Sequence, residues 1–276
     1  MAKITTLKLQ EMKDKGEKIT MVTAYDYSTA CLVEKAGIDV ILIGDSLMMT
    51  MLGDDSTVAC TMDQMIHHTK PVVLGAPNTH IVTDMPFGSY NVSKEEAIKN
   101  ATRMLKEGRC DAVKLEGGRE IAETIKAIVD AGIPVMGHIG LTPQTVSKLG
   151  GFKVQGKGDA AKDVLEDALA VEAAGAYSIV LECIPEQLGK LITEKLRIPT
   201  IGIGGGRFTD GQVMVYHDMV GLFEKFIPKF VKQYINLGPE IIKALETYKE
   251  EVKSGAFPGE EHTFGGVSEE ELKRLY

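Results

Sequence analysis

The chain has 276 residues, of which 44% are hydrophobic, and its formal net charge is −8. This length is enough for one large domain with a sizeable core, whereas the acidic balance disfavours nucleic acid and anionic membranes as partners. The four cysteines lie far apart without a CxxC pair, which argues against a disulfide scaffold and a thiolate zinc site. Because residues 1–18 resemble neither a signal peptide nor a membrane span, we expect a cytoplasmic protein.

Short apolar runs rich in valine and isoleucine recur along the chain. They lack the alternation of a half-exposed strand, which is typical of parallel strands that are buried on both faces. The runs predict strands at 19–24, 39–44, 80–84, 112–116, 134–138, 178–182, 199–203 and 213–217.

The segments between these runs have helical patterns with recognisable ends. Thr61 with Gln64 and Ser93 with Glu96 have the spacing of capping boxes, and Asp159 is a further N-cap candidate. Glycines that suit a left-handed C-terminal cap follow several of the helical patterns, at Gly37, Gly108, Gly132 and Gly175.

Eight strands separated by helices predict a closed (β/α)8 TIM barrel, whose usual length of about 250 residues is close to that of this chain. We expect an N-terminal helix, a C-terminal helical extension and a single catalytic domain over residues 1–276. The extension is predicted to be helical from about 229 to 248, with a surface loop and a short helix capped by Ser268 and Glu271 after it. An open doubly wound sheet is the alternative.

Polar side chains follow five consecutive predicted strands. Asp45 and Ser46 end the second strand, and the next four end in Asp84, Glu116, His138 and Glu182. The active site of a (β/α)8 barrel lies at the carboxyl ends of its strands, so these side chains are expected to meet there. Taken singly, each carboxylate is more typical of the N-cap of the next helix, and His138 of a core histidine. Their joint placement favours an active site.

Lys114 lies two residues before Glu116, so the two side chains share one face of the fourth strand. A buried lysine is costly unless it is paired or used. It is either one half of a structural ion pair with Glu116 or an aspartate, or a cation that receives a substrate carboxylate or oxyanion.

Acids without cysteines indicate a hard divalent cation such as Mg²⁺. Asp45 and Asp84 are candidate direct ligands, and Glu116 is a ligand either directly or through water. Only one histidine, His138, is available, so an iron or zinc site is less well supported than a magnesium site. Gly204–Gly206 after the seventh strand either cradle a phosphate or only allow close packing.

Several motifs now point to one family. "TAYDY", "GDSL", "DMPFGSY", "VKLEGG", "GHIGLTPQ", "GGFKVQGK", "LECIP", "IGIGGG", "DGQV" and "PKFVKQY" occur in the order seen in the ketopantoate hydroxymethyltransferase family. The resemblance runs from about residue 3 to 265. It implies a (β/α)8 barrel that transfers a hydroxymethyl group from 5,10-methylenetetrahydrofolate to 3-methyl-2-oxobutanoate with Mg²⁺. The product, 2-dehydropantoate, leads to pantothenate and coenzyme A.

The resemblance also implies roles for individual residues. Asp45, Asp84 and Glu116 match the metal site, Glu182 matches the proton acceptor, and the residues that match the oxo acid site are Asp45, Ser46, Asp84, Lys114 and His138. Family members assemble as homo-oligomers, often decamers, so we expect a homo-oligomer.

The same residues are also compatible with three other hypotheses about function. One is another Mg²⁺-dependent 2-oxo acid C–C lyase or mutase of related barrel fold, although the lysine–lysine–cysteine–glycine–histidine signature of the isocitrate lyase group is absent. Another makes Lys114 the Schiff-base lysine of a metal-free aldolase. The non-enzymatic reading is a barrel that serves as a binding or scaffold protein.

Overall fold

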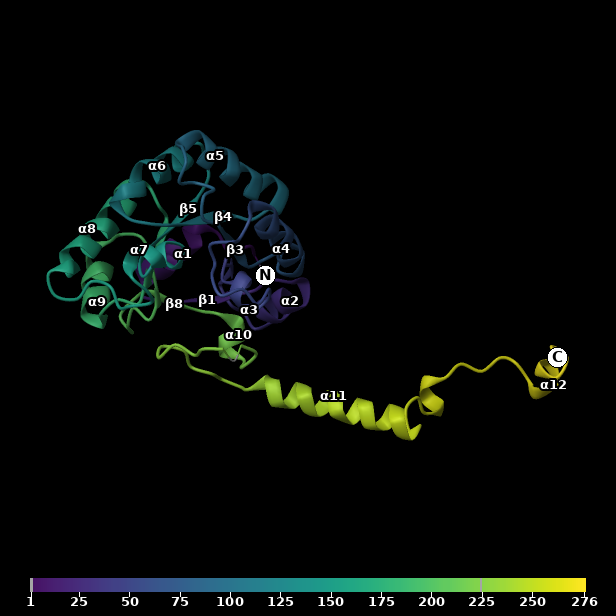
Figure 1. Ribbon diagram of the computed structural model, residues 1–276. Coiled ribbons are helices and arrows are strands. Elements are labelled where there is room, and N and C mark those ends of the chain that lie inside the picture. The colour runs from purple at the N-terminus through teal and green to yellow at the C-terminus, as the bar shows by residue number, and fades with distance from the viewer. Residues whose placement is uncertain (1, 224) are drawn as a thin grey trace.

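The computed structural model describes residues 2–223 and 225–276, and its centre is a closed barrel of parallel strands (Figure 1). Each strand pairs with the next along the chain, and the last pairs with the first. This closure confirms the predicted (β/α)8 fold and excludes the open sheet. The strands are β1 (Ile19–Thr23), β2 (Val40–Ile43), β3 (His80–Asp84), β4 (Ala112–Glu116), β5 (Val135–Gly140), β6 (Ser178–Glu182), β7 (Thr200–Ile203) and β8 (Gly211–Met214).

The predicted strand positions agree closely with the observed ones except at the end of the barrel. β3, β4 and β6 have the predicted bounds, whereas β8 begins and ends earlier than the predicted 213–217. The reason lies at Gly211, where a Cβ atom would be 2.4 Å from the carbonyl oxygen of Ile19. The strand therefore starts at a residue whose lack of a side chain lets β1 and β8 approach, which an apolar pattern does not reveal.

The apolar core has two layers. Inside the barrel, side chains from the strands pack with Leu9 and Met12 of α1 (Thr6–Lys15), so the predicted N-terminal helix covers one end of the barrel. Between the strands and the outer helices lies a larger cluster that includes Ile41, Val113 and Ile179. Because successive residues of a strand face opposite sides, both faces of every strand need apolar side chains.

Helices follow most of the strands and form the outer layer (Figure 1). They are α2 (Tyr27–Lys35), α3 (Leu47–Thr50), α4 (Met62–Gly75), α5 (Lys94–Arg103), α6 (Ala122–Asp130), α7 (Val146–Leu149), α8 (Ala160–Ala173), α9 (Glu186–Lys195) and α10 (Tyr216–Met219). Shorter helical turns are η1 (Met104–Gly108), η2 (Arg119–Ile121), η3 (Pro143–Thr145) and η4 (Glu260–His262).

The predicted helix ends are confirmed in part. Thr61 with Gln64 and Ser268 with Glu271 form complete capping boxes. Ser93 accepts the N–H of Glu96, but the Glu96 side chain is bonded to Asn100 instead of returning to the cap. Asp159 occupies an N-cap position without a side-chain hydrogen bond.

The prediction of a left-handed cap at Gly108 is wrong, although Gly37, Gly132 and Gly175 do have positive φ. The left-handed residue is Arg109, with φ of 65°. Gly108 itself belongs to the π-helical turn η1, and its Cα faces Thr69 of α4 so closely that a Cβ would lie 3.1 Å from the Thr69 methyl. Close helix packing, not a cap, therefore accounts for this glycine.

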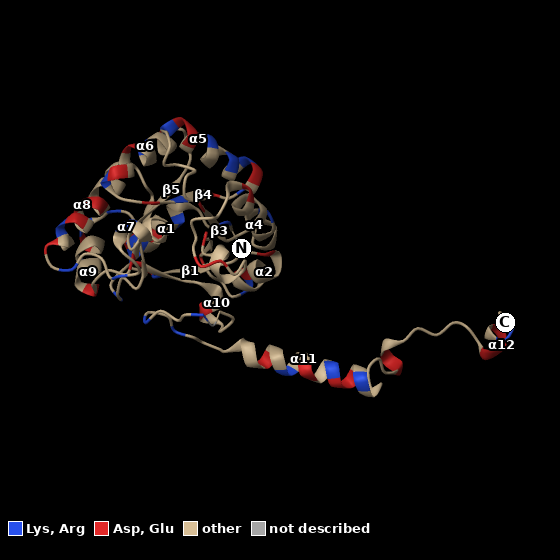
Figure 2. Cartoon of the chain, in the orientation of Figure 1, with Lys and Arg blue, Asp and Glu red and all other residues tan. Residues whose placement is uncertain are grey.

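The C-terminal extension is helical, but its main helix starts later than predicted. α11 spans Leu237–Ser254 and α12 spans Glu269–Leu272, whereas residues 229–236 are not helical. Both helices lie away from the barrel (Figure 1), and charges of both signs alternate along α11 (Figure 2). Over the described residues, none of the helices is long and apolar enough to cross a membrane.

Candidate active site

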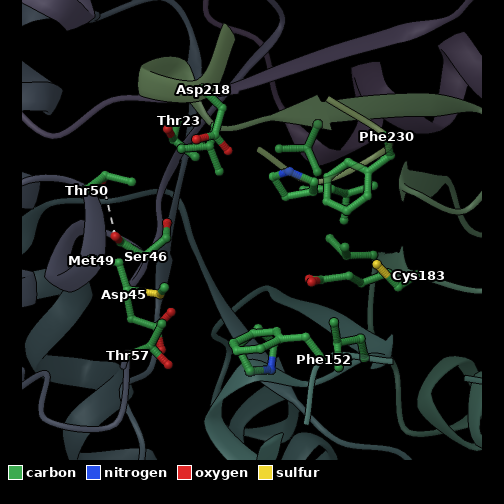
Figure 3. A pocket seen from close by; sticks show the side chains of 18 of the residues that line it. Thr23, Asp45, Ser46, Met49, Thr50, Thr57, Phe152, Cys183, Asp218 and Phe230 are labelled. Carbon is green, nitrogen blue, oxygen red and sulfur yellow. Dashed lines mark hydrogen bonds between the residues drawn. The ribbon is translucent and has the colours of Figure 1, made fainter. Parts of the chain in front are cut away.

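A cavity of about 570 Å³ opens at the carboxyl ends of the strands. Figure 3 shows Asp45 and Ser46 on one side of it and Cys183, Phe152 and Phe230 across from them. Every residue that the sequence placed in the site lines this cavity, namely Asp45, Ser46, Asp84, Lys114, Glu116, His138 and Glu182. The strand ends therefore bring the predicted polar side chains together, as the barrel topology requires.

Lys114 is paired with Asp84 at the bottom of the cavity. Its ammonium Nζ lies 3.0 Å from Oδ1 of Asp84, and both side chains are 4% exposed. Burial alone would lower the pKa of Lys114, but Asp84, Glu116 and Asp45 together outweigh it and raise the pKa above its ordinary value. Lys114 is thus a buried cation held by an aspartate on the neighbouring strand.

His138 connects the acids of β4 and β6. Its Nε2 lies 3.0 Å from Oε2 of Glu182, and its Nδ1 lies 3.4 Å from Oε1 of Glu116. Burial and Lys114 lower the pKa of His138, but Glu116 and Glu182 outweigh them and raise it to about 9. The imidazolium is therefore favoured at neutral pH. The Nδ1–Nζ distance of 3.1 Å to Lys114 would be a hydrogen bond only with a neutral ring, and the surrounding carboxylates favour the charged one.

Asp45 and Asp84 form the acidic pair of the site. The backbone N–H of Asp45 donates to Oδ2 of Asp84 at 3.1 Å. Burial, followed by Asp84 and Glu116, raises the pKa of Asp45 well above its ordinary value, and burial also raises that of Asp84 despite Lys114. The carboxylates outnumber the cations here, so the site favours a ligand that brings positive charge.

Ser46 is held by a buried tyrosine. The hydroxyl groups of Ser46 and Tyr25 are 2.8 Å apart, and the Thr50 hydroxyl donates to the Ser46 carbonyl at 3.2 Å (Figure 3). Burial raises the pKa of Tyr25 to about 12, so its hydroxyl stays protonated. This contact fixes the Ser46 side chain beside Asp45.

The carboxylates are not the N-caps of the helices that follow their own strands. Ser46, not Asp45, occupies the N-cap position of α3, and the side chain of Asp45 accepts a hydrogen bond from Gln144. Glu116 accepts the backbone N–H of Gln144. An N-cap role therefore does not explain why these acids stand at the strand ends.

Gln144, for which the sequence predicted no role, holds these acids together. Its Nε2 donates to Oδ2 of Asp45 and to the Met85 carbonyl, both at 2.9 Å, and its Oε1 accepts the hydroxyl of Tyr90 at 2.6 Å. Its backbone N–H donates to Oε2 of Glu116 at 3.0 Å. The sequence signal that could have indicated Gln144 is the motif "GHIGLTPQ", in which a proline begins a helical turn shortly after the strand end.

The glycines after β7 are explained by packing. A Cβ on Gly205 would lie 2.7 Å from the Leu181 carbonyl oxygen, and one on Gly206 would lie 2.6 Å from the Glu186 side chain. These contacts require glycine without any ligand. The structure therefore favours the packing explanation over a phosphate cradle.

The donor set fits one divalent cation at the acidic pair. Within residues 2–223 and 225–276, no group of three or more His, Cys, Asp or Glu side chains is arranged to hold a metal ion. Mg²⁺, however, commonly takes only one or two protein carboxylates. Asp45 and Asp84 are both buried, and Lys114, which lies 3.0 Å from Oδ1 of Asp84, brings only one positive charge to the pair. This excess of carboxylate is consistent with a ligand role for the Asp45–Asp84 pair. Both oxygens of Glu116 already face Gln144 and His138.

Comparison with known proteins places the chain among transferases. The family model described as ketopantoate hydroxymethyltransferase matches residues 3–260. The 3-methyl-2-oxobutanoate hydroxymethyltransferase of Heliobacterium modesticaldum is 61% identical over 275 residues, which cover 99% of each chain. The enzyme of the same name from Syntrophomonas wolfei is 56% identical over 277 residues and 100% of each chain.

Solved structures resemble the chain in fold. A phosphonopyruvate hydrolase in complex with oxalate and Mg²⁺ superposes with a TM-score of 0.62 at 12% identity, covering 100% of this chain and 95% of the other. A 2,3-dimethylmalate lyase of the PEP mutase/isocitrate lyase superfamily gives 0.61 at 14% identity, covering 98% and 94%. These similarities show a common barrel architecture.

Proposed function

Because this chain belongs to the ketopantoate hydroxymethyltransferase family, we propose that it transfers a hydroxymethyl group from 5,10-methylenetetrahydrofolate to 3-methyl-2-oxobutanoate, giving 2-dehydropantoate for pantothenate and coenzyme A synthesis. One observation supports this proposal most directly. A buried cation paired with an aspartate, Lys114 with Asp84, shares a cavity with a carboxylate held by a histidine, Glu182 with His138. The first pair suits binding of an oxo acid, and the second suits removal of its proton.

Glu182 is the base in this proposal. Its carboxylate takes the proton from C3 of the oxo acid, and the electron pair left behind forms the enolate with the C2 carbonyl. His138 holds the carboxylate through Nε2, and Lys114 balances part of the negative charge of the substrate. C3 then forms a bond to the methylene carbon, which the folate supplies as an iminium. The methylene carbon takes a hydroxyl group from one water as its remaining bond to the folate nitrogen breaks. The second proton of that water and the proton taken from C3 end on N5 and N10 of the departing tetrahydrofolate.

We propose that the cation is Mg²⁺ and that Asp45 and Asp84 hold it, with Glu116 contributing directly or through water. A bound divalent cation would stabilise the negative charge that develops on the oxo acid. The excess of buried carboxylates supports this assignment. Calorimetry of the Asp84→Asn variant tests it independently of turnover, because Mg²⁺ affinity is expected to fall while the fold persists. Unchanged affinity would remove Asp84 from the ligand set.

A product assay tests the function itself. The protein is incubated with 3-methyl-2-oxobutanoate and 5,10-methylenetetrahydrofolate, with EDTA and with Mg²⁺ restored. We expect 2-dehydropantoate to form, to disappear with EDTA and to return with the metal. Absence of product from the metal-replete protein would contradict the proposal.

The second candidate is another Mg²⁺-dependent 2-oxo acid C–C lyase or mutase, which the shared barrel fold favours. Folate-independent cleavage or rearrangement of an oxo acid would identify it. The Schiff-base reading of Lys114 is disfavoured, because Asp84 and Glu116 keep this amine protonated whereas imine formation needs the neutral amine.

We further propose a cytoplasmic single-domain enzyme that acts as a homo-oligomer, on the family pattern a decamer. The free state of all four cysteines is consistent with a reducing compartment. Ile241, Leu245, Tyr248 and Val252 form one apolar stripe on α11, and each is at least 45% exposed within the described chain. An exposed apolar stripe of this kind is typical of a protein–protein interface, which here would be formed with other copies of the chain.

Sedimentation velocity tests the assembly. We expect Leu245→Asp to dissociate it and Thr247→Asp, on the opposite side of α11, to leave it intact. A monomeric wild-type protein would contradict the proposal.

A further inference from the structure

Asp218 is a buried carboxylate that the chemistry above does not use. It lies on α10, directly after β8, and is 8% exposed. Figure 3 shows its carboxylate directed into the cavity beside Thr23. Within residues 2–223 and 225–276, no side chain or backbone group donates a hydrogen bond to this carboxylate. The carboxylate borders the cavity, so the groups that can donate to it are water or a ligand that enters the cavity.

The described neighbours of Asp218 do not donate to it. The hydroxyl oxygen of Thr23 accepts the backbone N–H of Tyr216 at 3.0 Å, and the imidazole of His217 stacks on Tyr25 with a ring separation of 5.5 Å. Burial raises the pKa of Asp218 to about 6, and no opposing cation contributes. A ligand with N–H groups would satisfy the carboxylate.

The cavity wall around Asp218 is mostly apolar and aromatic. Val213 and Val215 come directly before α10, Phe223 and Phe230 lie on the segment after it, and all four line the cavity. Phe152 also lines it, on the same side as Phe230 (Figure 3). At about 570 Å³ the cavity is large enough for a second molecule besides a small oxo acid. Its lining suits a flat ring system with apolar faces and polar edges.

The oxo acid itself is not the partner of Asp218. It is an anion, so a bare carboxylate would repel it, whereas Lys114 provides the cation that it needs. The co-substrate is different, because the reduced pterin ring carries a ring N–H and a 2-amino group side by side. Two parallel donors match the two oxygens of a carboxylate, as in bidentate arginine–carboxylate pairs.

We propose that Asp218 recognises the pterin ring of the folate co-substrate by accepting hydrogen bonds from its 2-amino group and the adjacent ring N–H. This inference rests on the proposed function. It assigns the part of the cavity at Asp218 to the one-carbon donor and the acidic part to the oxo acid. Asp218 is thus a specificity residue for the donor and takes no part in removing the C3 proton.

The experiment compares wild type with Asp218→Asn and Asp218→Ser, and Asp54→Asn serves as the control. Asp54 is an exposed carboxylate on the same cavity, and its acceptor oxygen can be replaced by that of asparagine. Two quantities are measured for each protein: tetrahydrofolate affinity by calorimetry, and exchange of the C3 proton of 3-methyl-2-oxobutanoate with D₂O without folate. We expect the Asp218 variants to bind tetrahydrofolate about 10- to 100-fold more weakly, since charge-assisted bonds are lost. Their exchange rates should stay within about twofold of wild type.

A ligand-side deletion sharpens the comparison. On wild type, a tetrahydrofolate analogue without the 2-amino group should bind more weakly than tetrahydrofolate. On Asp218→Asn, the analogue and tetrahydrofolate should bind with equal affinity, because the hydrogen bond to the 2-amino group is already lost. Unchanged tetrahydrofolate affinity in the variants would overturn the inference, and so would a parallel loss of affinity and exchange, which would make Asp218 a structural residue. Failure of the proposed function is distinct, because wild type itself would then form no 2-dehydropantoate.

Discussion

The side-chain amide of Gln144 lies 2.9 Å from the carboxylate of Asp45 and donates a hydrogen bond to it. Through its backbone N–H the same residue also holds Glu116 at 3.0 Å. A single turn after β5 therefore orients acids that belong to β2 and β4. Because Gln144 is 4% exposed and its own Oε1 is satisfied by Tyr90, the contact is fixed before any ligand binds.

Replacing Gln144 with leucine should loosen the acidic pair. Leucine keeps the approximate size but removes the donor to Asp45 and one of the two acceptors of the Tyr90 hydroxyl, which keeps the Glu116 carbonyl at 3.0 Å. We expect the free energy of unfolding to fall by about 1–3 kcal/mol and Mg²⁺ affinity to decrease. Urea unfolding and calorimetry measure the two effects. The matched control is Gln10→Leu, whose amide bonds lie on the outer surface, and equal Mg²⁺ affinity in both variants would argue against a positioning role for Gln144.

The sequence predicted the barrel and its acidic rim because both follow from local patterns. Buried parallel strands give continuous apolar runs, and β3, β4 and β6 were located to the residue. Asp84 and Glu116 could be assigned to one rim because parallel strands end at the same edge.

What the sequence could not provide are contacts between distant segments. Gln144 reaches Asp45 across 99 positions of the chain, and a glutamine in a turn has no local pattern that identifies such a partner. Likewise, the choice of Asp84 over Glu116 as the partner of Lys114 depends on the pairing between β3 and β4, in which Asp84 lies opposite Lys114. The start of β8 was misplaced for the same reason, since Gly211 is required by the close approach of β1.

Lys114→Met should affect the oxo acid more than the folate. Methionine keeps the apolar stem but removes the cation that faces the substrate, and a charge-assisted hydrogen bond contributes about 1.5–3 kcal/mol. The oxo acid should therefore bind about 10- to 100-fold more weakly, while tetrahydrofolate affinity changes little. Equilibrium titration with each ligand separates the two effects. Lys99→Met, on the exposed face of α5, is the control, and equal losses for both ligands would indicate a merely structural lysine.

Asp218→Asn should stabilise the folded protein above pH 6. The pKa of Asp218 is about 6 in the folded protein against an ordinary value of 3.8, so ionisation costs the folded state more than the unfolded one. This penalty is absent below pH 4, grows between pH 4 and 6 and is complete above that range. Asparagine removes it, which should raise the free energy of unfolding by about 1–3 kcal/mol at pH 8 and by little at pH 4.

Urea unfolding without ligands at these two pH values measures this difference. The exposed control Asp54→Asn should change the free energy of unfolding by less than about 0.5 kcal/mol at either pH. If Asp218→Asn were equally or less stable than wild type at pH 8, the carboxylate would have a stabilising partner, and the view of Asp218 as an unsatisfied ligand group would be wrong.

Glu182→Gln separates proton removal from substrate binding. Glu182 ends β6, whereas the acidic pair Asp45 and Asp84 lies at β2 and β3, so the base and the proposed metal ligands come from different parts of the rim. Glutamine keeps the size of the side chain and a carbonyl oxygen but cannot take the C3 proton. We therefore expect the variant to bind Mg²⁺ and 3-methyl-2-oxobutanoate as wild type does.

Its folate-independent exchange of the C3 proton with D₂O should be slower by about 10²- to 10⁴-fold, the usual contribution of a general base. Proton NMR of the oxo acid measures this rate, with Glu186→Gln on α9 as the control that should exchange normally. Exchange at the wild-type rate in Glu182→Gln would exclude Glu182 as the base and leave His138, which lies 3.0 Å from it, as the next group to replace.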